Sequence, residues 1–181
     1  KALGKTITLE RLRKDFDAVF LAMGLQGVNA LNTRSEESDG VEDAVDYIAE
    51  LRQAKDLGKL PVGRHVLVIG GGMTAIDIAV QSKLLGAEEV TILYRRGASQ
   101  MKASRFEQEL AQTKGVKIKH WVMPRKVLVK DGKAIGIECE YTEGKTGKLT
   151  GTGETFKLKA DMICKAIGLT YVSGPTLYEI V

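Results

Sequence analysis

The segment HVLVIGGGMTAID at residues 65–77 constrains the fold more than any other part of the sequence. A mostly apolar run leads into three consecutive glycines, and apolar residues at helical spacing follow them. Each glycine costs conformational entropy on folding, so three in a row indicate that another group must come close to this backbone. A buried strand, a glycine turn and a helix together predict a β-α-β unit in a parallel sheet.

The glycine turn also fits the pattern G-x-G-x-x-A between the predicted strand and helix. In dinucleotide-binding folds the first glycine permits a tight turn, the second lets the pyrophosphate approach the backbone, and the small third residue allows close helix packing. Free N–H groups at the helix N-terminus then bind the phosphates. A turn that merely joins strand to helix is the simpler alternative. The residues that we expect at this site are Gly70, Gly71, Gly72, Met73, Thr74 and Ala75.

Two arginines, Arg95 and Arg96, follow the next predicted strand, where an NAD-binding site usually has a carboxylate. A carboxylate there would repel a 2′-phosphate, whereas a guanidinium binds it through charge-assisted hydrogen bonds. Each such bond contributes about 1.5–3 kcal/mol, which is enough for tenfold to hundredfold discrimination. The pair therefore favours NADP(H), with NAD(H) as the alternative. The other interpretation of the pair is a solvated charge cluster at a strand end.

The first half of the chain supplies the elements around this unit. We expect a strand at 15–22 and a polar loop at 25–40. A helix is predicted at 41–57, capped by Asp39 with Glu42 three residues on, and ended by Gly58. The helix after the glycine turn should end at Gly86, and a strand at 89–94, a helix at 103–114 and a strand at 116–121 should follow.

The second half changes in pattern. Residues 125–141 predict a hairpin with a type I′ turn at Asp131 and Gly132. Residues 142–154 read as a flexible connection, and residues 155–168 supply the last strands. The predicted fold class is α/β: a Rossmann-like parallel sheet with an appended antiparallel β-meander.

Length and composition narrow the function classes. The 181 residues suffice for one domain, or one domain with fragments of another, and the net charge of +4 makes no case for nucleic acid. No apolar run is long enough to span a membrane, no signal peptide is recognisable, and the missing initiator methionine suggests an excised piece. Cys139 and Cys164 form no CxxC pair, so we expect buried, inert thiols and a cytoplasmic location.

Other candidate catalytic groups are weak. Tyr141 and Lys145 match the YxxxK pair of short-chain dehydrogenases, but Gly144 argues for a loop instead of the helix that this pair needs. His65 and His120 have no carboxylate or cysteine partner nearby in the sequence and read as strand residues. We therefore predict no catalytic side chain and no metal site in this chain. A nucleotide site without acid–base groups favours hydride transfer to a second cofactor.

The motifs resemble a known family. VLVIGGGMTAID, EEVTILYRRG and SRFEQELAQTKGV are similar to the NAD(P)H-binding domain of the glutamate synthase small-chain group, which includes the flavin module of dihydropyrimidine dehydrogenase. The later MPRKVLVKDGKAIGIECEYTE and LKADMICKAIG resemble the dihydropyrimidine dehydrogenase branch more closely. With DAVFLAMG and GVEDAVDYIAEL, the resemblance covers nearly the whole chain.

This resemblance implies an NADPH domain inserted into an FAD domain, with DAVFLAMG and DMICKAIG as the two crossings. Hydride would pass from NADPH to FAD, and electrons would continue through iron–sulfur clusters to a distant substrate site. The implied domains are flanking strands of the FAD domain at 1–24, an NAD(P)H-binding domain at 25–168, and the start of the return into the FAD domain at 169–181.

The resemblance also implies roles for individual residues. Arg95 and Arg96 would hold the 2′-phosphate, with Lys102 as a further basic partner. Asp77 matches the TAxD pattern of the family without a definite role, and Met73 replaces its usual aspartate, which leaves the hydrogen bonding near the nicotinamide open. Residues that would lie on the nicotinamide side are Ala166, Ile167 and Gly168.

Three functional hypotheses follow. In the first, the chain is the NADPH module of an FAD-dependent oxidoreductase, inactive alone because the FAD motif and the iron–sulfur cysteines are missing from it. Its partners would be the FAD domain of the same polypeptide and an iron–sulfur or catalytic subunit, with no nucleic acid and no membrane. The second is a nucleotide-sensing domain without redox turnover. The third is a self-contained dehydrogenase that uses Tyr141 and Lys145.

Overall fold

The computed structural model of the protein describes residues 3–4, 6–20, 27–145 and 148–170, without the side chains of Lys145 and Thr170. The chain divides into two compact units, one of residues Lys1–Gly27 with Leu169–Val181 and one of residues Val28–Gly168. We call the second the larger unit. Most of the predicted return segment at 169–181 lies outside the described residues.

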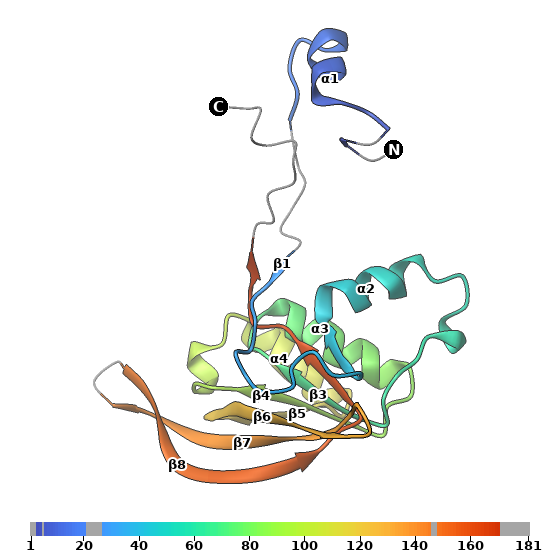
Figure 1. The fold of residues 1–181 in the computed structure, drawn as a ribbon. Helices are drawn as coiled ribbons and strands as arrows, with labels where there is room; N and C mark the ends of the chain where they lie inside the picture. Colours follow the sequence, from blue (N-terminus) through green and yellow to red (C-terminus); the bar gives the residue numbers. More distant parts are fainter. Residues whose placement is uncertain (1–2, 5, 21–26, 146–147, 171–181) are drawn as a thin grey trace. The chain divides into compact units, whose positions relative to one another are not determined.

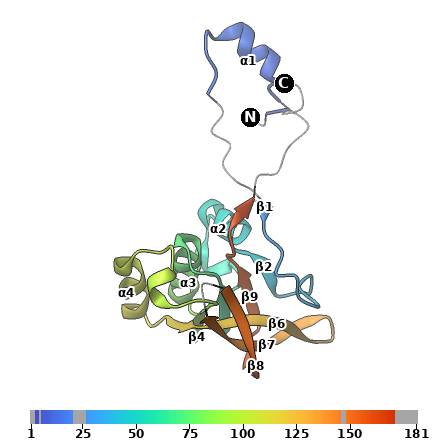
Figure 2. The same ribbon diagram turned by 90° about the vertical axis from the view of Figure 1, so that its left-hand side faces the viewer.

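A parallel sheet of five strands forms the centre of the larger unit, in the order β2-β9-β3-β4-β5. Three helices cover one of its faces, and the antiparallel sheet β6-β7-β8 covers the other (Figures 1 and 2). The strands of the parallel sheet are β2 (Val41–Asp43), β3 (His65–Ile69), β4 (Glu89–Tyr94), β5 (Lys117–His120) and β9 (Met162–Lys165). The helices are α2 (Ala44–Gln53), α3 (Met73–Leu84) and α4 (Arg105–Thr113). The antiparallel strands are β6 (Val122–Lys130), β7 (Lys133–Lys145) and β8 (Lys148–Lys159).

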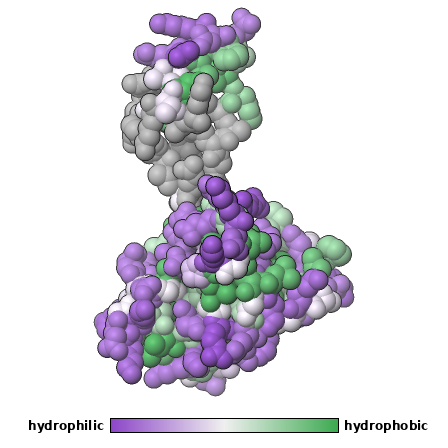
Figure 3. All heavy atoms as spheres, turned by 90° about the vertical axis from the view of Figure 1, so that its right-hand side faces the viewer, coloured by the Kyte–Doolittle hydropathy of each residue, from purple (hydrophilic) through white to green (hydrophobic). Residues whose placement is uncertain are grey.

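Strand β3 shows why the sheet needs cover on both sides. Successive side chains of a strand point to opposite faces, and β3 is apolar on both. Val66 and Val68 pack in the core cluster under the helices, whereas Leu67 and Ile69 pack in a second cluster against the antiparallel sheet. The glycine turn that follows β3 is thus anchored in the middle of three layers. Hydrophilic residues cover most of one outer face of the larger unit, with smaller hydrophobic areas between them (Figure 3).

The structure confirms the predicted α/β architecture and its central elements. Strands β3 and β4 have the predicted bounds, and α4 and β5 lie within two residues of theirs. Helix α3 ends two residues before Gly86, whose φ of +106° suits glycine. The predicted hairpin joins β6 to β7, and the positive φ of Asp131 (52°) and Gly132 (80°) fits a type I′ turn.

The predicted strand at 15–22 is wrong for the residues that the structure describes. Helix α1 (Leu9–Asp15) ends there, and residues 16–20 form no strand, while residues 21–22 lie outside the description. Thr8 caps this helix by accepting a hydrogen bond from the N–H of Arg11 at 3.2 Å. A strand needs a neighbour for its backbone groups, and residues 16–20 have no such neighbour among the described residues.

The predicted start of the helix at 41–57 is also wrong. Val41–Asp43 form β2, which pairs with β9, so the helix begins at Ala44 with Asp43 at the N-cap. The helix ends at Gln53, before a short 3₁₀ turn (Leu57–Lys59) that contains Gly58. Asp39 instead ties the chain to the β6–β7 turn, because its N–H donates to the carbonyl oxygen of Gly132 at 3.2 Å.

The segment 142–154 is not a flexible connection. It belongs to the long β7–β8 hairpin, apart from residues 146–147, which the structure does not describe. Threonine is favoured in strands, and Thr142 and Thr150 lie in this ladder. The buried carboxylate of Glu140 accepts a hydrogen bond from the N–H of Gly153 at 2.8 Å and pairs with Arg125 at 3.1 Å. These contacts hold a glycine-rich segment in strand conformation.

Both cysteines are buried and free, as predicted. Burial raises the pKa of Cys139 and of Cys164 to about 12, whereas the pKa of a thiol in the unfolded chain is about 8.5. Above about pH 8.5 the unfolded state releases protons that the folded state keeps, so the free energy of unfolding should fall as pH rises towards about 12. We expect a loss of up to about 1.4 kcal/mol per pH unit for each thiol.

Urea unfolding across this pH range measures the loss, with Cys139→Ala as the matched variant. In this variant the free energy of unfolding should fall less steeply with pH, because only one of the two thiols contributes. Rapid alkylation of the native protein near about pH 8 would contradict the burial of these groups, because the thiolate is the reactive form.

Candidate functional site

The predicted site residues meet at one edge of the sheet. Because the five strands are parallel, their carboxyl ends lie at the same edge, where ligands of open α/β sheets bind. The glycine turn follows β3, the arginine pair follows β4, and residues 166–168 follow β9. A hydrogen bond ties the segment after β9 to the end of β3, since the N–H of Ala166 donates to the carbonyl oxygen of Ile69 at 2.8 Å.

The three glycines are needed for different reasons. Gly70 has a φ of +147°, and a Cβ there would overlap the carbonyl oxygen of Ala166. A Cβ on Gly71 would overlap the ring of Tyr94. A Cβ on Gly72, in contrast, would meet nothing within 4 Å. The protein itself therefore requires the first two glycines, while the third keeps open a space that the protein does not fill.

Helix α3 begins at this open position. Gly72 is its N-cap and offers no side-chain hydrogen bond, and the first N–H groups of a helix have no partner within it. Met73 is exposed, Thr74 is half-buried, and Ala75 is fully buried where the helix packs on the sheet. The turn thus presents main-chain donors and the positive end of the helix dipole towards the edge of the sheet.

The turn that carries Arg95 and Arg96, which we call the arginine turn, lies next to the glycine turn. The side chain of Arg95 is exposed and that of Arg96 is half-buried, and neither forms an ion pair with any acidic residue that the structure describes. Their backbones are held in place: the hydroxyl of Thr142 donates to the carbonyl oxygen of Arg95 at 2.8 Å, and the N–H of Trp121 donates to that of Arg96 at 3.3 Å. Two cationic groups on a fixed turn suit an anionic ligand.

Lys102 is brought to the glycine turn by its backbone. The N–H groups of Lys102 and Ala103 both donate to the carbonyl oxygen of Gly71, at 2.9 and 3.0 Å. The side chain of Lys102 is exposed and forms no ion pair within the described part of the chain. A third cation therefore lies beside the glycine turn and the arginine turn.

Residues 166–168 close the other side of the glycine turn. Gly168 has a φ of +103°, and Asn29 binds this segment. Asn29 donates from its N–H to the carbonyl oxygen of Gly168 at 3.2 Å, and from its side chain to those of Ile167 and Gly168 at 3.3 Å each. Asn29 lies in a stretch that the sequence marked only as a loop, and no local signal identified it.

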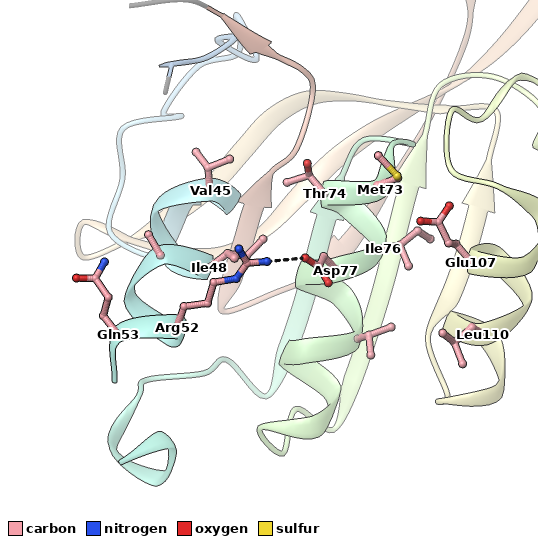
Figure 4. Close-up of a pocket in the computed structure, with 12 residues that line it drawn as sticks. Val45, Ile48, Arg52, Gln53, Met73, Thr74, Ile76, Asp77, Glu107 and Leu110 are labelled. Atoms are coloured by element: carbon pink, nitrogen blue, oxygen red, sulfur yellow. Dashed lines mark ion pairs between the residues drawn. The ribbon is translucent and has the colours of Figure 1, made fainter. Parts of the chain in front are cut away.

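Asp77 lies one turn further along α3 and faces α2. Its carboxylate pairs with Nη2 of Arg52 at 3.7 Å, across a groove of about 740 Å³ lined by α2, α3 and α4 (Figure 4). Met73 and Thr74 lie at the end of this groove where α3 begins. The family pattern gives Asp77 no definite role, and its place in the cofactor site stays a prediction.

We expect Asp77→Asn to change the free energy of unfolding by less than about 1 kcal/mol, because exposed ion pairs contribute little. The two side chains are 51% and 72% exposed. Denaturant unfolding measures the change, and Arg52→Gln is the matched control because it breaks the same pair. A loss of dinucleotide affinity in Asp77→Asn that Arg52→Gln does not share would give the carboxylate a role in binding.

The other candidate groups are not assembled into a catalytic site. His65 and His120 lie in strands, as predicted, and desolvation lowers the pKa of His120. Tyr141 and Lys145 share strand β7, so the helical arrangement of the YxxxK pair does not exist here. Among the described residues there is no cluster of His, Cys, Asp or Glu that could hold a metal ion, and no helix long and apolar enough to cross a membrane.

Comparison with known proteins identifies the family. Residues 3–174 match the family described as pyridine nucleotide-disulphide oxidoreductase. The chain belongs to this family. Its relatives include the beta subunit of NADPH-Fe(3+) oxidoreductase from Geobacter sulfurreducens, at 33% identity over 92% of this chain and 26% of the relative.

Two further members of the pyridine nucleotide-disulphide oxidoreductase family confirm the resemblance seen in the motifs. The small chain of glutamate synthase [NADPH] from Escherichia coli K12 is 35% identical over 78% of this chain and 32% of the relative. The NAD-dependent dihydropyrimidine dehydrogenase subunit PreT of Escherichia coli O157:H7 is 33% identical over 92% of this chain. The chain spans 26–36% of the length of these three relatives.

A solved structure supports the fold. FprA of Mycobacterium tuberculosis in complex with NADPH superposes with a TM-score of 0.73 at 21% identity, over 96% of this chain and 55% of FprA. At this identity the likeness concerns the architecture, and it agrees with the predicted dinucleotide-binding α/β fold.

Proposed function

We propose that this chain is the NADPH-binding module of an FAD-dependent oxidoreductase. The observation that carries the proposal is the open space at Gly72. At the two glycines before it, other groups of the protein occupy the place of a Cβ. The adjoining segments supply main-chain donors and three cations without ion-pair partners among the described residues: Arg95, Arg96 and Lys102. This combination suits a pyrophosphate with one additional phosphate nearby.

The residues present fit the dinucleotide in the following way. The N–H groups at Gly72, Met73 and Thr74 would hold the pyrophosphate, with Gly70 and Gly71 shaping the turn and Ala75 seating the helix. Arg95 and Arg96 would bind the 2′-phosphate, with Lys102 beside them. The nicotinamide would lie towards the segment that follows β9, at Ala166, Ile167 and Gly168.

The chemistry then belongs to the cofactors. When bound, NADPH supplies a hydride, and the residues of this chain bind and orient it. In the full-length protein FAD would accept the hydride and pass electrons to iron–sulfur clusters. The flanking segments 1–24 and 169–181 would belong to the FAD domain, and residues 25–168 to the NADPH domain. The NADPH in the names of the Geobacter and glutamate synthase relatives supports this cofactor, while the name of PreT supports NAD as the alternative.

Calorimetric titration of the 181-residue chain tests the proposal. NADPH should bind with a stoichiometry of one, and FAD should not bind. A chain that purifies with flavin absorbance, or that shows no heat with NADPH, would overturn the proposal. The coding sequence on either side of this chain distinguishes an oxidoreductase module from a nucleotide-sensing domain. If the chain is a sensing domain, we expect no FAD motif and no cysteine cluster in the flanking sequence.

A further inference from the structure

Trp121 has features that packing alone does not require. It is the single tryptophan of the chain and directly follows β5 at the carboxyl edge of the parallel sheet. Its backbone is in the left-handed region with a φ of 59°, a conformation that costs about 1–3 kcal/mol and concentrates at functional sites. The residue is 38% exposed, although a tryptophan in a core is largely buried.

The indole ring lies against the arginine turn. A Cβ on Gly97 would lie 3.0 Å from Cζ2 of Trp121, and a Cβ on Gly144 would lie 3.4 Å from Cη2 and Cζ3. Glycine at both positions lets the ring approach the two backbones. Gly97 directly follows the two arginines, so the partly exposed indole adjoins the turn that carries them.

Hydrogen bonds join the backbone of Trp121 to the backbone of the arginine turn. Trp121 donates from its N–H to the carbonyl oxygen of Arg96 at 3.3 Å and accepts a hydrogen bond from the N–H of Thr142 at 2.9 Å. The hydroxyl of Thr142 in turn donates to Arg95 at 2.8 Å. Thr142 of strand β7 therefore ties the backbone of Trp121 to the backbones of the two arginines.

The geometry points to Trp121 as a binding residue for the adenine base of the dinucleotide, an inference that rests on the proposed function. Adenine and the 2′-phosphate are carried by adjacent carbons of one ribose. A phosphate bound by Arg95 and Arg96 therefore places the base within a few ångströms of this turn, where the partly exposed indole would stack on it. Stacking of a base on an aromatic side chain is worth about 1–3 kcal/mol, which corresponds to roughly 5- to 150-fold in affinity.

Tryptophan fluorescence of the intact chain tests the inference, since all emission comes from Trp121. Titration with 2′,5′-ADP, which carries the base and the 2′-phosphate without nicotinamide, should quench or shift the emission in a saturable way. Nicotinamide mononucleotide should leave it unchanged. Calorimetry should show about 5- to 150-fold weaker binding of 2′,5′-ADP to Trp121→Ala, with most of the affinity restored in Trp121→Phe.

The outcomes separate this inference from the proposed function. If 2′,5′-ADP produces heat but leaves the emission unchanged, the dinucleotide site stands and the role of Trp121 is overturned. Equal affinities of wild type and Trp121→Ala would overturn it as well. If neither 2′,5′-ADP nor NADPH produces heat, the proposed function itself fails. Because the fluorescence experiment uses the wild-type chain, it decides the question even if Trp121→Ala does not fold.

Discussion

Gly70→Ala is expected to destabilise the protein by about 3–5 kcal/mol, because it combines backbone strain with overpacking against a rigid carbonyl group. The position has a φ of +147°, and the added methyl group would overlap the backbone of Ala166, which β9 holds in place. A loss of this size is a large part of the stability of an ordinary domain. Urea or thermal unfolding of the variant measures it directly.

Gly72→Ala is the matched control, with the opposite consequence. Its φ of −100° suits alanine and the space is empty, so the free energy of unfolding should change by no more than about 1 kcal/mol. Its methyl group would instead occupy the space proposed for the pyrophosphate, and NADPH affinity should fall at least about tenfold. Unchanged NADPH affinity in a folded Gly72→Ala protein would place the dinucleotide elsewhere.

Arg95→Glu is expected to change the ratio of NADPH to NADH affinity by about a hundredfold or more. The substitution removes charge-assisted hydrogen bonds worth about 1.5–3 kcal/mol each and puts a negative charge near the 2′-phosphate. The new carboxylate can also accept a hydrogen bond from the 2′-hydroxyl group of NADH. Calorimetric titrations with both nucleotides give the two dissociation constants.

Arg64→Glu controls for the change in net charge. Arg64 immediately precedes β3, so it lies at the opposite edge of the sheet, where its guanidinium pairs with Glu88. This variant should keep the NADPH preference of the wild type. If Arg95→Glu and Arg64→Glu bind both nucleotides alike, the 2′-phosphate is not bound by the arginine turn.

Elements with strong local signals were predictable from sequence, and elements that depend on distant partners were not. Strands β3 and β4 have apolar runs long enough to be buried, and the turns that bound them have clear residue preferences. Val41–Asp43, in contrast, form a strand only because β9, far along the chain, pairs with them. The β7–β8 hairpin was missed for a similar reason, since the contacts of Glu140 stabilise a glycine-rich segment.

The candidate site shows the same division. The glycine turn and Arg95 follow from a motif with a physical explanation, and the fold places both at one edge of the sheet. Trp121 and Asn29 reach that edge through contacts between segments far apart in the sequence. No local pattern marks either one as a site residue, because Trp121 falls in the predicted strand at 116–121 and Asn29 in the predicted loop at 25–40.

The hydrogen bond between the N–H of Asn29 and the carbonyl oxygen of Gly168 means that the chain enters and leaves the larger unit at one point. A module with adjoining ends closes no long loop when it is inserted into a host protein, so the insertion costs little entropy. Such modules tolerate being grafted between different hosts.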